Sequence, residues 1–107
     1  MSKPEMVFAL YRPHAGKEAE LEQILKRHVP VLQSLGLSTD RPSFVARAGD
    51  GTYVEVFEWA DGEAARRAHD LPAVAEVWEA IGQVADLRTL ADLEEIRRPF
   101  PHFQTVW

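Results

Sequence analysis

Apolar residues recur along this chain at two different spacings, which together predict an order of strands and helices. Residues 6–12 contain the apolar run Val-Phe-Ala-Leu-Tyr and predict a first strand, which Pro13 closes. Over residues 17–35 the apolar positions recur at steps of three and four, which is the spacing of one helical face. Pro30 lies inside this segment, and because proline lacks an amide hydrogen we expect the helix to kink or end early there.

A β-hairpin is predicted in the middle of the chain. Residues 43–48 and 52–59 favour two strands, and Gly49-Asp50-Gly51 between them supplies glycines for a tight turn. Because side chains alternate along a strand, the second of these strands has one face made of Tyr53, Glu55, Phe57 and Trp59.

Two short helices and a last strand are predicted to follow the hairpin. Asp61 is a good N-cap for a helix that ends near Leu71, and Pro72 suits the first turn of another helix. The second helix has an apolar face and is expected to stop at Gly82. Residues 84–90 then predict a fourth strand.

The predicted order β-α-β-β-α-β indicates an α+β protein of the ferredoxin-like class, with a four-stranded antiparallel sheet. Both helical segments would cover one face of this sheet. The strand over residues 52–59 is apolar or aromatic on both faces, so the other face also needs a cover. The same face of a second copy is the simplest cover, and we therefore predict a homodimer.

The whole chain, residues 1–107, is predicted to be a single domain with a core over about residues 6–90 and a C-terminal tail over residues 91–107. One helical turn is expected near residues 91–96, and prolines beyond it exclude a helix or a central strand. Phe100, Phe103 and Trp107 are costly to leave in water, so we expect the tail to pack on the core or on the partner subunit. The alternative is a frayed terminus.

Composition and charge argue against several classes of partner. The formal net charge is −5, whereas a phosphate-binding surface needs positive charge, so no nucleic acid is expected. No apolar run approaches the roughly 18 residues of a membrane helix, and the N-terminus lacks the apolar stretch of a signal peptide. The chain has no cysteine, which fits a cytoplasmic location, and its four histidines show no metal-ligand spacing.

A motif of about 25 residues joins the third strand to the last helix. It consists of the sequence VEVFEWADGEA over residues 54–64, followed by His69, Pro72-Ala73-Val74 and Trp78. This motif resembles the antibiotic-biosynthesis-monooxygenase-like (ABM-like) branch of the dimeric α+β barrel superfamily. The resemblance implies a dimer with facing sheets, and a pocket between sheet and helices in each subunit.

The resemblance also implies a set of activities that includes cofactor-free oxygenation, cyclisation and isomerisation. Quinol-oxidising and haem-degrading members of the superfamily commonly use an asparagine in the first strand, and this chain contains no asparagine. That departure makes haem degradation an unexpected activity here and weakens cofactor-free oxygenation. We expect no cofactor.

His69 is the candidate catalytic residue, at a position where the resembled proteins often place a histidine. A neutral imidazole can take up or pass on a proton near neutral pH. The alternative is a structural histidine that caps a helix end or bonds a backbone carbonyl. His28, on the apolar face of the first helix, is interpreted as a core residue.

The candidate ligand-binding residues are Tyr11, Arg12, Glu55, Trp59 and Trp78. Tyr11 or Arg12, at the end of the first strand, would steady a developing oxyanion. If its face of the strand is buried, Glu55 needs a partner or a raised pKa. A raised pKa would make it a plausible base, and a salt bridge to Arg12 or Arg47 is the favoured interpretation. The two tryptophans either stack on a flat aromatic ligand or belong to the core.

These observations leave two functions open. The first is a homodimeric barrel whose pocket binds a small apolar or aromatic molecule and acts as a cofactor-independent monooxygenase, or as a cyclase or isomerase, on an aromatic or polyketide-like substrate. The alternative is a non-catalytic dimer that binds a small molecule or has a structural role.

Overall fold

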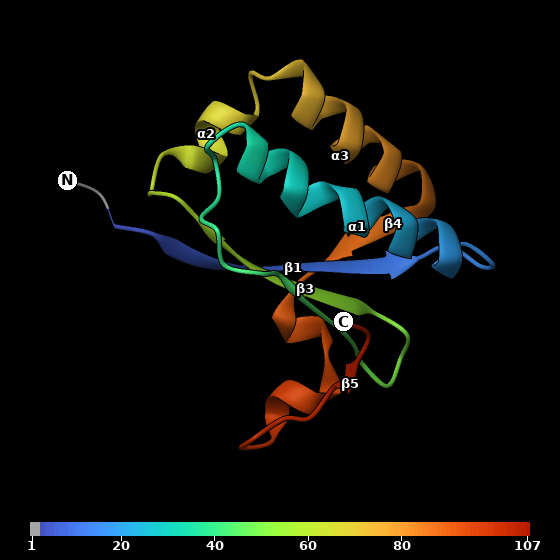
Figure 1. The fold of residues 1–107 in the computed structure, drawn as a ribbon. Coiled ribbons are helices and arrows are strands. Elements are labelled where there is room, and N and C mark those ends of the chain that lie inside the picture. Colours follow the sequence, from blue (N-terminus) through green and yellow to red (C-terminus); the bar gives the residue numbers. More distant parts are fainter. Residues whose placement is uncertain (1–2) are drawn as a thin grey trace.

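A five-stranded antiparallel sheet organises the computed structural model, which describes residues 3–107 (Figure 1). The strands lie in the spatial order β4-β1-β3-β2-β5. Their bounds are β1 Glu5–Pro13, β2 Phe44–Arg47, β3 Tyr53–Trp59, β4 Ala85–Arg88 and β5 Gln104–Thr105. The ferredoxin-like order of the first four strands is confirmed. The predicted number of four strands is wrong, because the C-terminal residues add β5 to the edge formed by β2.

Three helices cover one face of the sheet (Figure 1). They are α1 (Glu18–Ser34), α2 (Ala64–Ala68) and α3 (Pro72–Val84), and α1 packs against α3. The buried positions of α1 are Leu21, Ile24, Leu25, His28, Val29 and Leu32, which follow the predicted helical spacing. Within residues 3–107, no helix has both the length and the apolar character needed to cross a membrane.

Two helices extend past the residues predicted to interrupt or end them. Helix α1 continues through Pro30 to Ser34, and α3 continues through Gly82 to Val84. In both cases a residue beyond the expected stop is buried: Leu32 in α1 and Val84 in α3. Burying these side chains in the core stabilises the last turn, whereas local propensity alone would end the helix earlier.

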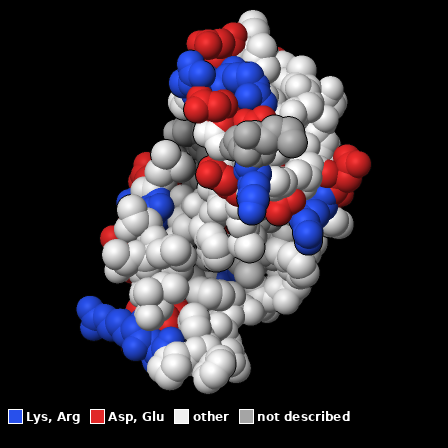
Figure 2. All heavy atoms as spheres, turned by 90° about the vertical axis from the view of Figure 1, so that its left-hand side faces the viewer, with Lys and Arg blue, Asp and Glu red and all other residues white. Residues whose placement is uncertain are grey.

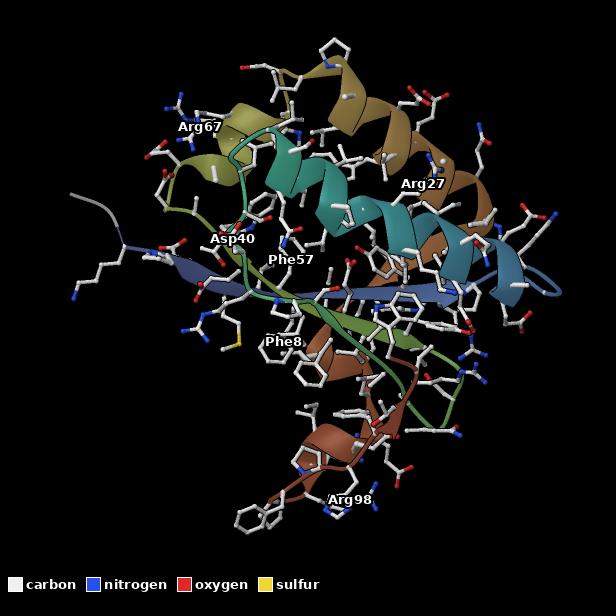
Figure 3. The ribbon with its side chains drawn as sticks, in the orientation of Figure 1. Phe8, Arg27, Asp40, Phe57, Arg67 and Arg98 are labelled. Carbon is white, nitrogen blue, oxygen red and sulfur yellow. The ribbon has the colours of Figure 1, made fainter. Side chains whose placement is uncertain are left out.

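The alternation of side chains along β1 and β3 separates two faces of the sheet. Figure 3 shows Phe57 pointing toward the helices and Phe8 pointing to the opposite side. The core between sheet and helices contains Leu21, Val45 and Tyr53, each of which is fully buried. We call the opposite side the outer face; three of its side chains, Met6, Phe8 and Phe44, are exposed.

The segment over residues 89–107, called the arm here, leaves β4 and passes below the sheet (Figure 1). It contains two short 3₁₀ helices, η1 (Leu90–Asp92) and η2 (Glu94–Arg97), before β5. Leu93 is buried against Leu10 and Val54, and so covers part of the outer face. The amide of Val45 donates a hydrogen bond to the carbonyl of Trp107 at 2.8 Å. The arm thus packs on its own core, while Phe100 at its tip stays exposed.

Candidate functional site

A cavity of about 310 Å³ lies against the helix-facing side of β1 and β3. Ligand pockets typically begin at about this size, and their walls are mostly apolar. The apolar part of this wall consists of Val7, Ala9, Phe57, Trp59, Ile81, Gly82, Ala85 and Leu87. The wall also contains the polar groups of Tyr11, His28, His69 and Trp78, and Trp59 contributes a further indole N–H. Among the described residues, no Asp, Glu, Lys or Arg lines the cavity.

Small residues on facing elements leave this space open. Ala9 on β1, Gly82 on α3 and Ala85 at the start of β4 all line the cavity. A Cβ atom built on Gly82 would meet no other atom within 4 Å, so the missing side chain leaves open space there. The sheet and α3 therefore approach each other without filling the space between them.

A buried chain of hydrogen bonds runs along one side of the cavity, from β1 through β3 and α1 to α3. The hydroxyl of Tyr11 donates to Oε1 of Glu55 at 2.8 Å. Nδ1 of His28 lies 3.0 and 3.1 Å from the two carboxylate oxygens of Glu55. The indole Nε1 of Trp78 donates to Nε2 of His28 at 3.0 Å. Glu55 is completely buried and His28 is only 3% exposed.

These contacts determine which nitrogen of His28 carries the proton in this chain of hydrogen bonds. An indole N–H can only donate, so Nε2 of His28 is the acceptor and its Nδ1–H donates to Glu55. The Glu55 carboxylate thus accepts hydrogen bonds from His28 and Tyr11. Burial, followed by the charge and hydrogen bond of Glu55, raises the pKa of Tyr11 far above its usual value. The phenol therefore remains protonated and keeps its hydrogen on Glu55.

His69, the residue that follows α2, contacts the ring of Trp78. Its imidazole lines the cavity, is exposed, and meets the indole edge-on with ring centroids 4.9 Å apart. Within residues 3–107 its ring nitrogens have no hydrogen-bond partner, so the ring does not bond a backbone carbonyl. His69 is thus the imidazole in the wall whose nitrogens are free to meet a ligand.

Two of the interpretations made for charged residues are wrong. Arg12 does not line the cavity, because it lies on the outer face, where its guanidinium is 3.3 Å from Asp50. Glu55 forms no salt bridge with Arg12 or Arg47, since it faces the helices and pairs with His28. Arg47 instead pairs with Glu22 of α1.

The remaining candidates come together around the cavity. Tyr11, His69, Trp59 and Trp78 line it, and Glu55 lies directly behind Tyr11 and His28. With its hydrogen on Glu55, Tyr11 is not free to steady an oxyanion in this arrangement. The described residues contain no group of three His, Cys, Asp or Glu side chains placed to hold a metal ion.

His28 is the site residue whose role the sequence reasoning missed. It is buried, as a core residue should be, but it also lines the cavity and holds the Glu55 carboxylate. A signal for this pairing existed, because His28 lies on the predicted apolar face of the first helix and Glu55 shares a strand face with three aromatic residues. A buried carboxylate needs a donor, and the neighbouring helix face offers this histidine.

Two solved structures share this fold. One is a mutant of SnoaB, a cofactor-independent oxygenase from Streptomyces nogalater, with 20% sequence identity, a TM-score of 0.65, and coverage of 94% of this chain and 100% of that chain. The other is tetracenomycin F2 cyclase from Streptomyces glaucescens, a type II polyketide cyclase, with 21% identity, a TM-score of 0.57 and coverage of 87% of each chain. No family profile and no curated protein matches the sequence.

At these identities the likeness establishes the fold and leaves the activity to be argued from the site. The fold indicated by the motif over residues 54–78 is confirmed: the chain has the ferredoxin-like α+β fold that these two proteins share.

Proposed function

We propose that this protein binds a flat, largely apolar aromatic or polyketide-like molecule in the cavity and converts it by proton transfer, as a cofactor-independent oxygenase or a cyclase. The observation that carries this proposal is the exposed, unbonded imidazole of His69 in the wall of an otherwise apolar cavity. The oxygenase and cyclase activities named for the two similar structures support it.

His69 acts in this proposal as the base that starts either reaction. A carbon acid beside an aromatic ketone loses a proton to the imidazole and becomes an enolate. In an oxygenase the enolate itself reduces O₂, so that a CH₂ group and O₂ give a C=O group and water. In a cyclase the same enolate attacks a carbonyl within the substrate, and His69 returns the proton. Trp59 and Trp78 offer aromatic surfaces for the flat ligand.

We also propose that the protein acts as a homodimer whose subunits meet through their outer faces. The exposed Met6, Phe8 and Phe44 belong to this face, and the arm covers only part of it. Figure 2 shows charged side chains gathered at the top of the view and Lys or Arg side chains at its lower left, with mostly uncharged surface between them. Because the cavity lies on the helix side of the sheet, each subunit would keep its own.

The test uses anthrone, a tricyclic aromatic ketone with an acidic CH₂ group, as the probe substrate. We expect the native protein to accelerate its conversion to anthraquinone with matching uptake of O₂. His69→Gln should lower kcat by roughly 100-fold or more, the usual contribution of a general base, while the melting temperature stays unchanged. His14→Gln is the matched control, since the exposed His14 bonds Asp86 and does not line the cavity.

Two results would contradict parts of this proposal. Activity that survives in His69→Gln would remove His69 from the role of base. Saturable binding of anthrone without conversion of anthrone or of polyketide-like ketones would instead identify a non-catalytic ligand-binding protein, which is the alternative function.

A further inference from the structure

The bond between Trp78 and His28 is the point where the buried hydrogen-bond chain meets the cavity. His28 uses Nδ1 to hold Glu55, and Nε2 has the Trp78 indole as its partner. Both rings line the cavity, so a molecule bound there lies beside this hydrogen bond. Trp78 is half-buried, packs against both core clusters on the helix side, and its ring also contacts that of the exposed His69, so a ligand that takes its place at Nε2 must shift the indole within the cavity wall.

We infer that a ligand with an acidic O–H group displaces the Trp78 indole from Nε2 of His28, and that His28 then accepts the ligand's proton. The inference rests on the proposed function, because the cavity must hold an aromatic ligand. The O–H bond of the ligand breaks, an N–H bond forms at Nε2, and the ligand becomes a phenolate or enolate. The step needs no oxidant or further reactant.

The Glu55 carboxyl group behind His28 favours this proton transfer once the indole has moved. The Glu55 carboxyl group lies directly behind the His28 imidazole and also accepts the hydrogen bond of Tyr11. A proton on Nε2 gives an imidazolium–carboxylate pair without net charge. A carboxylate behind an imidazole also orients the ring and stabilises its protonated form, as in Ser-His-Asp enzymes. The indole N–H opposes protonation of Nε2 only until the ligand replaces it.

The cavity wall also defines the charge of the ligand. No Asp, Glu, Lys or Arg of the described residues lines the cavity, so a ligand that arrives already charged meets no permanent counter-charge there. A neutral phenol or enol can enter and become ionised only beside His28. His28 and His69 would thus act on different groups, with His28 at the buried side of Trp78 and His69 at the exposed side.

The experiment compares 4-nitrophenol with 4-nitroanisole, which has a methoxy group in place of the hydroxyl. Nitrophenolate absorbs visible light, so ionisation of the bound probe is measured directly at a pH below the pKa of free 4-nitrophenol. We expect the native protein and His69→Gln to produce the nitrophenolate band on binding. His28→Gln should bind the probe without producing the band, because its amide can bond Glu55 and Trp78 but cannot take up a proton.

Trp78→Phe provides a second test that does not depend on how well His28→Gln folds. This variant removes the indole N–H that the ligand must displace. The affinity for 4-nitrophenol should therefore rise roughly three- to tenfold relative to that for 4-nitroanisole, which corresponds to one hydrogen bond.

Each of the other outcomes overturns the inference in a recognisable way. If the band persists in His28→Gln and disappears in His69→Gln, then His69 is the acceptor and the proposed function stands without the inference. If both probes bind but no nitrophenolate band appears, then the buried hydrogen-bond chain has only a structural role. The same conclusion follows if Trp78→Phe leaves the affinity for 4-nitrophenol relative to 4-nitroanisole unchanged. If neither probe binds, then the proposed function fails together with the inference.

Discussion

The chain's two tyrosines both donate to carboxylates, but Tyr11 faces the cavity while Tyr53 links the sheet to α1. The hydroxyl of Tyr53 donates to Glu22, and Nη2 of Arg47 donates to the hydroxyl oxygen at 2.9 Å. Burial and then the hydrogen bond to Glu22 raise the pKa of Tyr53 to about 12. This cluster joins α1 to β2 and β3 at the hairpin end.

At the scale of the residue, we predict a loss of stability above pH 10 that depends on Tyr53. Its pKa is higher in the folded than in the unfolded chain, so its contribution is complete below about pH 10 and decreases as the pH rises toward 12. Tyr53→Phe should be less stable by about 1 kcal/mol at pH 7, because Glu22 and Arg47 lose a shared partner.

The measurement is urea unfolding of both proteins at several pH values between 7 and 11.5. The difference between their free energies of unfolding should shrink above pH 10. Subtraction removes the contribution of Tyr11, which both proteins retain. If the difference in free energy of unfolding stays constant up to pH 11.5, then folding does not raise the pKa of Tyr53 and the prediction is wrong.

At the scale of the element, α1 illustrates how packing overrides local preference. Pro30 has no amide hydrogen to donate to the carbonyl of Lys26, yet the helix continues for another turn. Val29 and Leu32 on either side are buried, while Pro30 itself is exposed. The helix therefore retains its last turn because of the core, and the proline lowers its stability.

Pro30→Ala should raise the free energy of unfolding by about 2 kcal/mol. Alanine restores the missing hydrogen bond and removes the ring clash, a gain of about 3 kcal/mol, and up to about 1 kcal/mol is lost because the unfolded chain becomes more flexible. Gln23→Ala, at another exposed position of α1, is the control and should change stability by less than about 0.5 kcal/mol. Unfolding in urea measures both. No gain from Pro30→Ala would mean that the proline fits this turn without strain.

At the scale of the whole molecule, the two faces of the sheet have different tasks. The helix side contains the core and the cavity, whereas the outer face exposes Met6 by 65%, Phe8 by 48% and Phe44 by 68%. Contiguous exposed apolar surface of this kind marks an interaction site. A second copy of the chain offers a matching surface, since a two-fold axis places the same patch on both partners.

We expect the native protein to be a dimer at micromolar concentration in native mass spectrometry and analytical ultracentrifugation. The double substitution Phe8→Lys and Phe44→Lys should give a folded monomer, because each lysine would bury a charge in the interface. Leu35→Lys is the control, since Leu35 is 41% exposed but lies at the end of α1, away from the outer face. A native protein that is monomeric at this concentration would refute the dimer.

The sequence by itself determined the features that depend on local periodicity. It predicted the order of strands and helices along the chain up to β4, the face that Glu55 shares with Phe57, and the buried face of α1. These follow because side-chain direction repeats every two residues in a strand and every 3.6 in a helix. The tertiary structure alone decided which residue lies opposite another across two elements. It paired Glu55 with His28 instead of an arginine, kept α1 helical past Pro30 and added β5 to the sheet. These outcomes depend on the packing of segments distant in sequence, which local spacing does not encode.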